Sequence, residues 1–395
     1  MHKSIKGLRL GTACAGIKKA DHRDLVLIEI AESSQVAAVF TQNAFCAAPV
    51  IIAKNHFNKE TPRYLLINTG NANAGTGEQG IADSLECCKA VAEISGCDVE
   101  SVLPFSTGVI GESLAVDKIL AGIKVAYDQL AEEGWVDASN GILTTDTRAK
   151  LLSETAEING KTVTITGMSK GSGMIRPNMA TMLAYLATDA IIEADTLQQC
   201  LQSAVDVSFN RITVDGDTST NDACVLVATG KSKVTIKKDD KSYTEFCQLL
   251  ESLCTKLAKE MVRDAEGATK LINIVVNGGV DNGECQHVAY TVAHSPLVKT
   301  AFFASDPNWG RILAAVGRSG IESLELNKLE IYLDEICIVS NGGRDPAYQE
   351  TDGQKVMDQS EITIRIELGR GTASGYVWTC DFSYDYVRIN AEYRT

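Results

Sequence analysis

The sequence predicts a mixed α/β protein built from two domains. Its 395 residues exceed what one hydrophobic core usually holds. Strand-like and helix-like runs alternate along most of the chain, and strand-like runs dominate from Leu271 onward. We therefore place a domain boundary near residue 275, between a domain of 1–275 and one of 276–395.

Local patterns place the elements along the chain. Short apolar runs rich in β-branched residues predict strands, whereas apolar residues repeated every three or four positions predict helices. The stretch 117–132 shows such a helical stripe, and Ser-Tyr-Thr-Glu at 242–245 forms a capping box that begins a helix. Helices are predicted at 81–94, 117–132, 195–205, 242–263 and 312–316, and strands at 25–30, 64–68, 161–166, 223–229, 234–237, 271–276, 329–333, 362–368 and 375–382.

Charge and hydropathy exclude two classes of partner. The chain carries 37 Lys and Arg against 51 Asp and Glu, a net charge of −14. Such a surface repels phosphate backbones, so we expect no nucleic-acid ligand. No run approaches about 18 apolar residues, and the charged N-terminal segment does not look like a secretory signal. We therefore expect no membrane partner and a cytoplasmic protein.

The cysteines and histidines form no metal-binding pattern. Twelve cysteines occur without a C-x-x-C motif, and the five histidines lack metal-ligand spacing. We expect no metal site, and we expect reduced, mostly buried thiols of the kind found in the cytoplasm.

A glycine-rich motif at 75–80, GTGEQG, matches the dinucleotide-binding pattern G-x-G-x-x-G. Two features count against that function. Gly75 comes seven residues after the strand end at Asn68, where the pattern needs a tight turn, and Glu78 would face the pyrophosphate. A structural or substrate loop is the better interpretation, and a nucleotide-binding module stays as an alternative.

Two further loops resemble known sites. The segment 215–222, DGDTSTND, resembles a calcium loop, but Thr220 replaces the required glycine and Leu226 cannot act as the last ligand. We interpret it as a hydrogen-bonded turn. For 305–311, SDPNWGR, the sequence leaves open whether the segment is a capped loop before a helix or shapes a site.

The segment 170–190 has an unusual form, in which a glycine-punctuated turn leads into small residues and then an apolar stretch. A threonine in such a stretch, here Thr181, usually serves packing. The segment, KGSGMIRPNMATMLAYLATDA, nevertheless resembles the self-cleavage segment of the ornithine acetyltransferase family of arginine biosynthesis. Further blocks similar to that family occur in family order: VFTQNAFCAAPV (39–50), INTGNANAGTG (67–77), FSTGVIGE (105–112), LTTDTRAK (143–150), FNRITVDGDTSTND (209–222), SDPNWGRI (305–312) and INAEYRT (389–395).

The resemblance implies a fold, a processing step and a reaction. The implied fold is an N-terminal-nucleophile-like αββα sandwich with a smaller C-terminal α/β domain. The implied processing is self-cleavage between Ala180 and Thr181, which gives chains 1–180 and 181–395 that assemble as a heterotetramer with two copies of each. The implied reaction moves acetyl from N2-acetyl-L-ornithine to L-glutamate through an acetyl ester of Thr181, without a cofactor. Whether acetyl-CoA also serves as donor stays open.

The chemistry explains why a threonine would become N-terminal. No histidine lies in the matched blocks, which argues against a Ser-His-Asp relay. The α-amino group of an N-terminal threonine has an ordinary pKa of about 7.7–8.0 and can accept the proton of its own hydroxyl. In an N-to-O acyl shift the Ala180 carbonyl would move from the nitrogen of Thr181 to its hydroxyl, which frees the amine as a base. Hydrolysis of the resulting ester by water would then cut the chain and expose the hydroxyl nucleophile.

The resemblance also assigns site residues by position. Thr107 and Gly108 correspond to the oxyanion pair, which offers a hydroxyl and a closely approachable backbone N–H. Lys170 and the terminal residues suit a carboxylate or acetyl oxygen, and Glu266 suits the side-chain ammonium of ornithine. Which threonine of 144–147 contacts the substrate stays open, and the terminal contacts require the C-terminus to return to the active site. The implied substrate contacts are Thr144, Lys170, Thr181, Glu266, Asn390 and Thr395.

Two rival functions remain at this point. An N-terminal-nucleophile aminopeptidase or amidohydrolase of related fold would pass the acyl group to water, and free acetate release would distinguish it. A nucleotide-binding module built on Gly75 to Gly80 would bind NAD or ATP directly.

Overall fold

The computed structural model describes residues 2–18, 21–176 and 182–393. Its contacts divide the chain into two compact units. The first unit comprises Met1–Gly171, Arg176–Asn210 and Thr218–Met261, and the second comprises Ser172–Ile175, Arg211–Asp217 and Val262–Thr395. The predicted domain division near residue 275 stays a prediction.

Two β-sheets form the first unit. One sheet has the order β1-β2-β4-β5 and the other the order β3-β9-β8-β7-β6. The strands of the first sheet are β1 (Leu8–Ala13), β2 (Leu25–Ile30), β4 (Tyr64–Asn71) and β5 (Val102–Val109). Those of the second are β3 (Gln35–Phe40), β6 (Lys150–Ile158), β7 (Lys161–Lys170), β8 (Leu183–Thr188) and β9 (Ala223–Ala228).

The two sheets pack face to face around one apolar core. Ile67 and Phe105 of the first sheet and Met168 and Tyr185 of the second belong to the same buried cluster. The rings of Phe105 and Tyr185 meet edge to face, with centroids 5.5 Å apart. The alternating inward residues of both sheets therefore make the middle of a sandwich.

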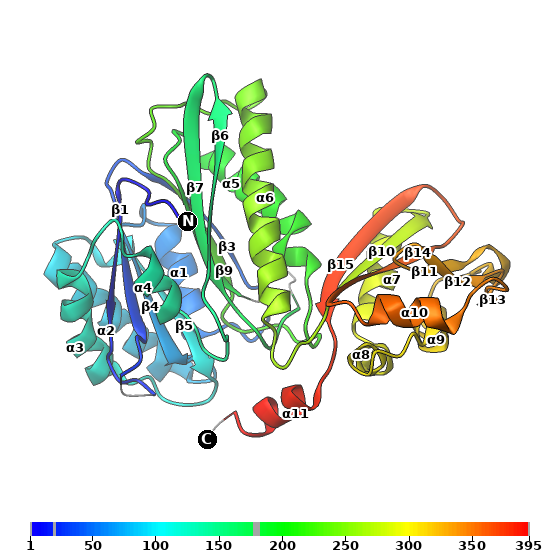
Figure 1. The fold of residues 1–395 in the computed structure, drawn as a ribbon. Helices are drawn as coiled ribbons and strands as arrows, with labels where there is room; N and C mark the ends of the chain where they lie inside the picture. The colour runs from blue at the N-terminus through cyan, green and yellow to red at the C-terminus, as the bar shows by residue number, and fades with distance from the viewer. Residues whose placement is uncertain (1, 19–20, 177–181, 394–395) are drawn as a thin grey trace. The chain divides into compact units, whose positions relative to one another are not determined.

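Helices cover both outer faces of this sandwich (Figure 1). On the first sheet, Leu66 belongs to the same buried cluster as Val91 of α2 and Ile123 of α3. On the second sheet, Gly167 of β7 lies beneath α6, where an added Cβ would come 3.1 Å from Leu257. The helices of this unit are α1 (Ala48–Phe57), α2 (Gly77–Ser95), α3 (Val116–Asp128), α4 (Trp135–Gly141), α5 (Ala194–Val207) and α6 (Lys241–Arg263), with 3-10 turns at Val99–Ser101 and Phe209–Arg211. The expected αββα sandwich is confirmed.

The second unit is a six-stranded sheet with helices packed on it. The order is β13-β12-β11-β14-β10-β15, in which β10 runs parallel to β14 and antiparallel to β15. The strands are β10 (Leu271–Gly279), β11 (Glu330–Leu333), β12 (Ile336–Ser340), β13 (Gly343–Arg344), β14 (Glu361–Glu367) and β15 (Ala373–Cys380). The helices are α7 (Asn282–Ala293), α8 (Pro296–Phe303), α9 (Trp309–Gly317), α10 (Glu350–Met357) and α11 (Tyr384–Ala391), with a 3-10 turn at Leu326–Lys328.

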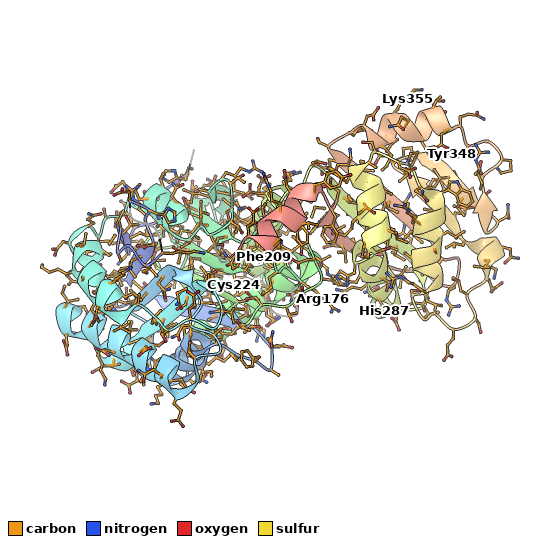
Figure 2. The ribbon with its side chains drawn as sticks, turned by 90° about the horizontal axis from the view of Figure 1, so that it is seen from below. Arg176, Phe209, Cys224, His287, Tyr348 and Lys355 are labelled. Carbon is orange, nitrogen blue, oxygen red and sulfur yellow. The ribbon has the colours of Figure 1, made fainter. Side chains whose placement is uncertain are left out.

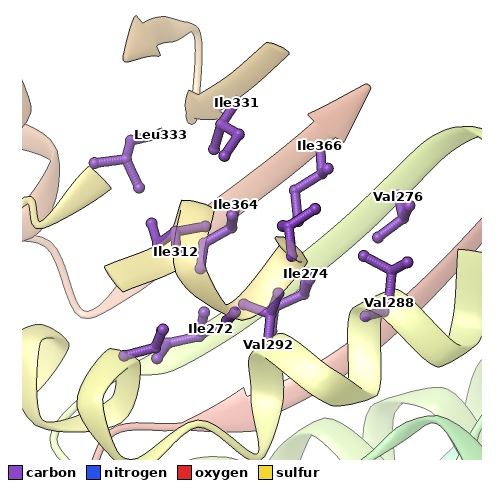
Figure 3. Close-up of a cluster of buried hydrophobic side chains, with 14 of the residues drawn as sticks. Ile272, Ile274, Val276, Val288, Val292, Ile312, Ile331, Leu333, Ile364 and Ile366 are labelled. Atoms are coloured by element: carbon purple, nitrogen blue, oxygen red, sulfur yellow. The ribbon is translucent and has the colours of Figure 1, made fainter. Parts of the chain in front are cut away.

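The alternation of apolar residues along the strands builds the core of the second unit. Ile272, Ile274 and Val276 of β10 belong to the same buried cluster as Val288 and Val292 of α7 (Figure 3). His287 of α7 and Lys355 of α10 lie at the surface, outside this core (Figure 2). The predicted smaller α/β unit at the C-terminal end is therefore observed. No helix in the described parts of the chain is both long and apolar enough to cross a membrane.

Two local predictions need correction. The run 234–237 is not a strand; it makes one isolated bridge between Thr235 and Ile191. The N-terminus of α6 is capped by Asp240, whose carboxylate accepts from the backbone N–H of Ser242 at 2.7 Å, and not by the predicted box at 242–245. The run 234–237 is short and flanked by lysines, and it has too few partners to continue the sheet. Asp240 reaches the first free N–H groups of α6 more directly than the predicted box does.

Candidate active site

Close backbone packing shapes the end of β5. Gly108 has φ 137°, and an added Cβ would lie 2.3 Å from the carbonyl carbon of Gly70 and 2.5 Å from the nitrogen of Asn71. The parallel register between β4 and β5 shifts at this point. Only glycine fits a positive φ and such a close approach, so the position after Thr107 is fixed by backbone contact.

Lys170 reaches Thr107 across the sandwich. Lys170 is the last residue of β7 and is buried, with 9% of its surface exposed. Its Nζ donates a hydrogen bond to Oγ1 of Thr107 at 3.0 Å. Because the hydroxyl accepts from the ammonium group, its own O–H remains available to donate.

Asp146 joins several segments beside this pair. Its side chain is fully buried, and its Oδ1 accepts from Nζ of Lys150 at 2.6 Å and from the backbone N–H of Gly171 at 2.8 Å. Its Oδ2 accepts from the backbone N–H of Thr144 at 3.2 Å. Burial alone would raise the pKa of this carboxyl, but the charges of Lys170 and Lys150 hold it below the usual range. Asp146 is therefore an ionised group between two cations.

Asp222 has the opposite character. It precedes β9, is fully buried, and its Oδ2 has no hydrogen-bond partner among the described residues. Burial raises its pKa well above the usual range, opposed in part by a hydrogen bond with Ser219 and by the charge of Lys170. Its neighbour Ala223 donates its backbone N–H to the carbonyl of Met182 at 3.0 Å. A buried carboxyl group with a raised pKa therefore lies one residue before Ala223, which holds Met182 at the start of β8.

The second unit contains a separate polar cluster around Glu266. This carboxylate is buried, with 6% of its surface exposed, and Nδ2 of Asn390 donates to it at 2.8 Å. Its backbone N–H donates to the carbonyl of Ser172 at 2.9 Å. An added Cβ at Gly173 would lie 2.4–2.6 Å from the carboxylate atoms, so the glycine allows the loop to approach closely.

The same loop is held from its other end by Asp215. Its carboxylate accepts from the backbone N–H groups of Met174 at 2.7 Å and Ile175 at 2.9 Å. The hydroxyl of Tyr386 in α11 donates to it at 3.3 Å. The calcium-like segment at 215–222 thus begins with a loop anchor. No group of three or more His, Cys, Asp or Glu suited to a metal occurs within the described ranges.

The structure brings the predicted site residues together in two groups. Thr107, Gly108, Lys170 and, through Asp146, Thr144 gather in the first unit. Glu266 and Asn390 meet in the second unit. The remaining three predicted residues, Ala180, Thr181 and Thr395, lie outside the described residues.

Sequence reasoning missed Asp146 and Asp222. Both are single acidic residues among small polar ones, inside the matched blocks 143–150 and 209–222. That context was a usable signal, because an acidic residue in a short Thr-rich turn often accepts backbone N–H groups.

The weak motifs have local structural roles. At 75–80 the hydroxyl of Thr76 donates to Oδ1 of Asn73 at 2.7 Å, and Asn73 donates to the carbonyl of Gly80 at 2.9 Å. The loop is thus closed by its own polar groups. At 305–311 the side chain of Asn308 accepts from the backbone N–H of Arg311 at 3.1 Å and caps α9.

The fold is an N-terminal-nucleophile-like sandwich, and comparison with known proteins gives the class of enzyme built on it: an acyltransferase of arginine biosynthesis. The sequence model of the ArgJ family matches residues 9–395. The arginine biosynthesis bifunctional protein ArgJ of Pseudomonas fluorescens (strain Pf0-1) is 53% identical over 393 residues, which cover 99% of this chain and 97% of the relative. That of Methylococcus capsulatus is 55% identical over 392 residues, which cover 99% and 96%. The chain belongs to the ArgJ family.

A solved relative agrees with this assignment. The crystal structure of arginine biosynthesis bifunctional protein ArgJ from Bacillus halodurans is 39% identical with a TM-score of 0.51. It covers 53% of this chain and 99% of its own. The predicted enzyme class, an acetyltransferase of arginine biosynthesis, is confirmed by the family and its relatives.

Proposed function

We propose that the protein moves acetyl from N2-acetyl-L-ornithine to L-glutamate through an acetyl ester on Thr181, which self-cleavage after Ala180 makes N-terminal. One observation carries the proposal above the others. The ammonium of Lys170 holds the hydroxyl of Thr107 next to the tightly packed Gly108, in a buried region of the first unit. Such preorganised donors are what an acyl-transfer transition state requires.

This geometry supports an oxyanion role for Thr107 and Gly108. With Lys170 donating to its oxygen, the Thr107 hydroxyl can donate to the developing negative charge together with the N–H of Gly108. Removal of one such donor typically costs about 3–4 kcal/mol in the barrier. The positive charge of Lys170 adds electrostatic stabilisation in a buried site.

Two findings support cleavage before Thr181. The position lies in the connection between β7 and β8, just before Met182, whose carbonyl is held by Ala223. The solved Bacillus halodurans chain corresponds to only 53% of this one, and a cut at this place would leave two chains of about half the length. The freed amine would then serve as base for its own hydroxyl.

The residues that the family resemblance implies as substrate contacts are chemically suited to that role. Lys170 and Thr144 suit a carboxylate or acetyl oxygen, and Glu266 suits the side-chain ammonium of ornithine. Asn390 uses one oxygen of Glu266 and leaves the other to accept from a ligand. The family resemblance implies Thr395 as a further substrate contact. The relatives are named bifunctional, which supports acetyl-CoA as a second acetyl donor.

The assembly and compartment are parts of the same proposal. Two copies of each cleaved chain would form a heterotetramer, which native mass spectrometry would count. All twelve cysteines are free thiols, which supports a reducing compartment such as the cytoplasm.

An intact mass spectrum tests the proposal. We expect two chains, the larger of which begins at Thr181. Incubation with acetylornithine alone should add one acetyl group to that larger chain, and initial rates at several glutamate concentrations should give the parallel lines of a ping-pong reaction.

Two variants serve as controls. Thr181→Ala should remain one inactive chain, whereas Thr181→Ser should still cleave because it keeps the hydroxyl. A fully active uncut chain would overturn the nucleophile. Acetate release that is equally fast with and without glutamate would instead identify a hydrolase.

A further inference from the structure

We propose that Asp146 is a positioning residue for acetyl transfer: its buried carboxylate aligns the end of β7 that carries Lys170 with the segment that carries Thr144. The inference rests on the proposed function, because it concerns how those two residues are held for that reaction.

The contacts of Asp146 bind two segments that are distant in the sequence. The carboxylate of Asp146 accepts a hydrogen bond from the backbone N–H of Gly171, the residue after Lys170, at 2.8 Å. It also accepts one from the backbone N–H of Thr144, two residues before Asp146, at 3.2 Å. The side chain of Asp146 thus holds the backbone at both Thr144 and Gly171. Because the side chain is fully buried, no water competes for these N–H groups.

The charges around Asp146 support the same inference. Asp146 lies in the field of two cations, Lys150 on β6 and Lys170 on β7. Lys170 also acts on Asp222, and burial raises the pKa of that carboxyl well above its usual range. Lys150 and Lys170 bring positive charge to this place, and positive charge suits a substrate carboxylate or an oxyanion. Two carboxyl groups with pKa values shifted in opposite directions are a common feature of catalytic sites.

A purely structural ion pair would look different. Lys150 alone, at 2.6 Å from Oδ1, would satisfy the charge of Asp146. The carboxylate also receives the N–H next to Lys170 and acts on the charge of Lys170. Buried ion pairs add little stability by themselves, so a second role is the better account of this arrangement.

The test compares the pH dependence of kcat/KM in three variants with that of the wild-type enzyme. Asp146→Asn keeps the size and removes the charge, so Lys170 should release its proton more readily. The pH at which kcat/KM begins to fall on the alkaline side, where we expect Lys170 to lose its proton, should be lower by about one unit or more. At a given pH on this alkaline limb, kcat/KM should therefore be about tenfold lower than in the wild type. Lys150→Gln removes the competing cation, so the same limb should move to higher pH.

Glu29→Gln is the matched control. Glu29 is a half-buried carboxylate of the same unit that pairs with Arg9 and accepts from the Tyr64 hydroxyl at 2.8 Å. Loss of the Glu29 charge should lower the melting temperature and leave the alkaline limb of the pH profile unchanged. If the limb of Asp146→Asn stays at the wild-type pH, the inference is wrong. Should that variant not fold, an unmoved limb in Lys150→Gln overturns it instead.

The two proposals fail in different ways. A wild-type enzyme that transfers no acetyl from acetylornithine to glutamate would overturn the proposed function before any variant is compared. A fully active wild-type enzyme, together with variants that share its pH profile, would overturn the role of Asp146 alone.

Discussion

At the scale of single residues, Asp222 makes stability depend on pH. Burial raises its pKa in the folded protein, whereas the unfolded chain has a value of about 3.9. Between these two values the folded state binds more protons than the unfolded state. The stability that comes from the protonated group is therefore complete below about pH 3.9 and is lost as the pH rises through the folded-state pKa.

Asp222→Asn should remove this loss, because an amide stays neutral at every pH. We expect the melting temperature of the variant, relative to wild type, to increase steadily as the pH rises from weakly acidic to alkaline. Thermal unfolding followed by circular dichroism at several pH values measures it. Asp137→Asn is the control, since Asp137 is exposed and pairs with Arg23 at the surface. Parallel curves for Asp222→Asn and wild type would contradict the expectation.

The sequence was informative about some site residues and silent about others. Thr107, Gly108 and Lys170 could be proposed because they lie in distinctive blocks such as FSTGVIGE, and the structure brings them together. Asp146 could not be assigned a role, since nothing in LTTDTRAK says that its carboxylate is buried between Lys150 and Lys170. Burial and charge pairing arise only when strands distant in the sequence meet.

At the scale of elements, α11 is held by few contacts. It has eight residues, none of them buried, and a helix this short is marginal by itself. Asn390 donates to Glu266 at 2.8 Å, Tyr386 donates to Asp215 at 3.3 Å, and the ring of Tyr386 stacks on Phe382 with centroids 4.5 Å apart. Polar pairing and ring stacking, not apolar burial, therefore dock this helix.

Asn390→Asp should undock α11 at neutral pH. The change sets a carboxylate against the buried carboxylate of Glu266, and two like charges in such a place repel. Hydrogen exchange of the backbone amides in α11 should become faster, and the KM for acetylornithine should rise, while cleavage before Thr181 continues. Val387→Ala, at a 65% exposed position of the same helix, should change neither quantity. Unchanged exchange in Asn390→Asp would show that other contacts hold the helix.

Elements with strong local patterns could be predicted, and those fixed by neighbours could not. The strand at 25–30 and the helix at 117–132 follow from their apolar periodicity. The strand β6 (Lys150–Ile158) has a weak pattern, and its pairing with β7 decides its conformation. The run 234–237 has the apolar pattern of a strand, but it makes only an isolated bridge, between Thr235 and Ile191.

At the scale of the whole molecule, the second sheet mixes strands from both sides of the proposed cut. In the order β3-β9-β8-β7-β6, the strands β3, β7 and β6 precede residue 180, and β8 and β9 follow it. The antiparallel ladders β3–β9 and β7–β8 each join six residue pairs across that division. Cleavage in the connection between β7 and β8 would remove no ladder hydrogen bond, so the sheet should survive it.

The two cleaved chains should therefore behave as one folded body. In native buffer they should elute together from a size-exclusion column, at the volume of the uncut Thr181→Ala variant. In concentrated guanidinium chloride the wild-type protein should separate into two chains and the variant should remain one. Separation would require breaking both ladders and exposing the core residues between the sheets, such as Tyr185 and Val225, which is too costly under native conditions. Two species that separate in native buffer would show that the strands do not interleave as described.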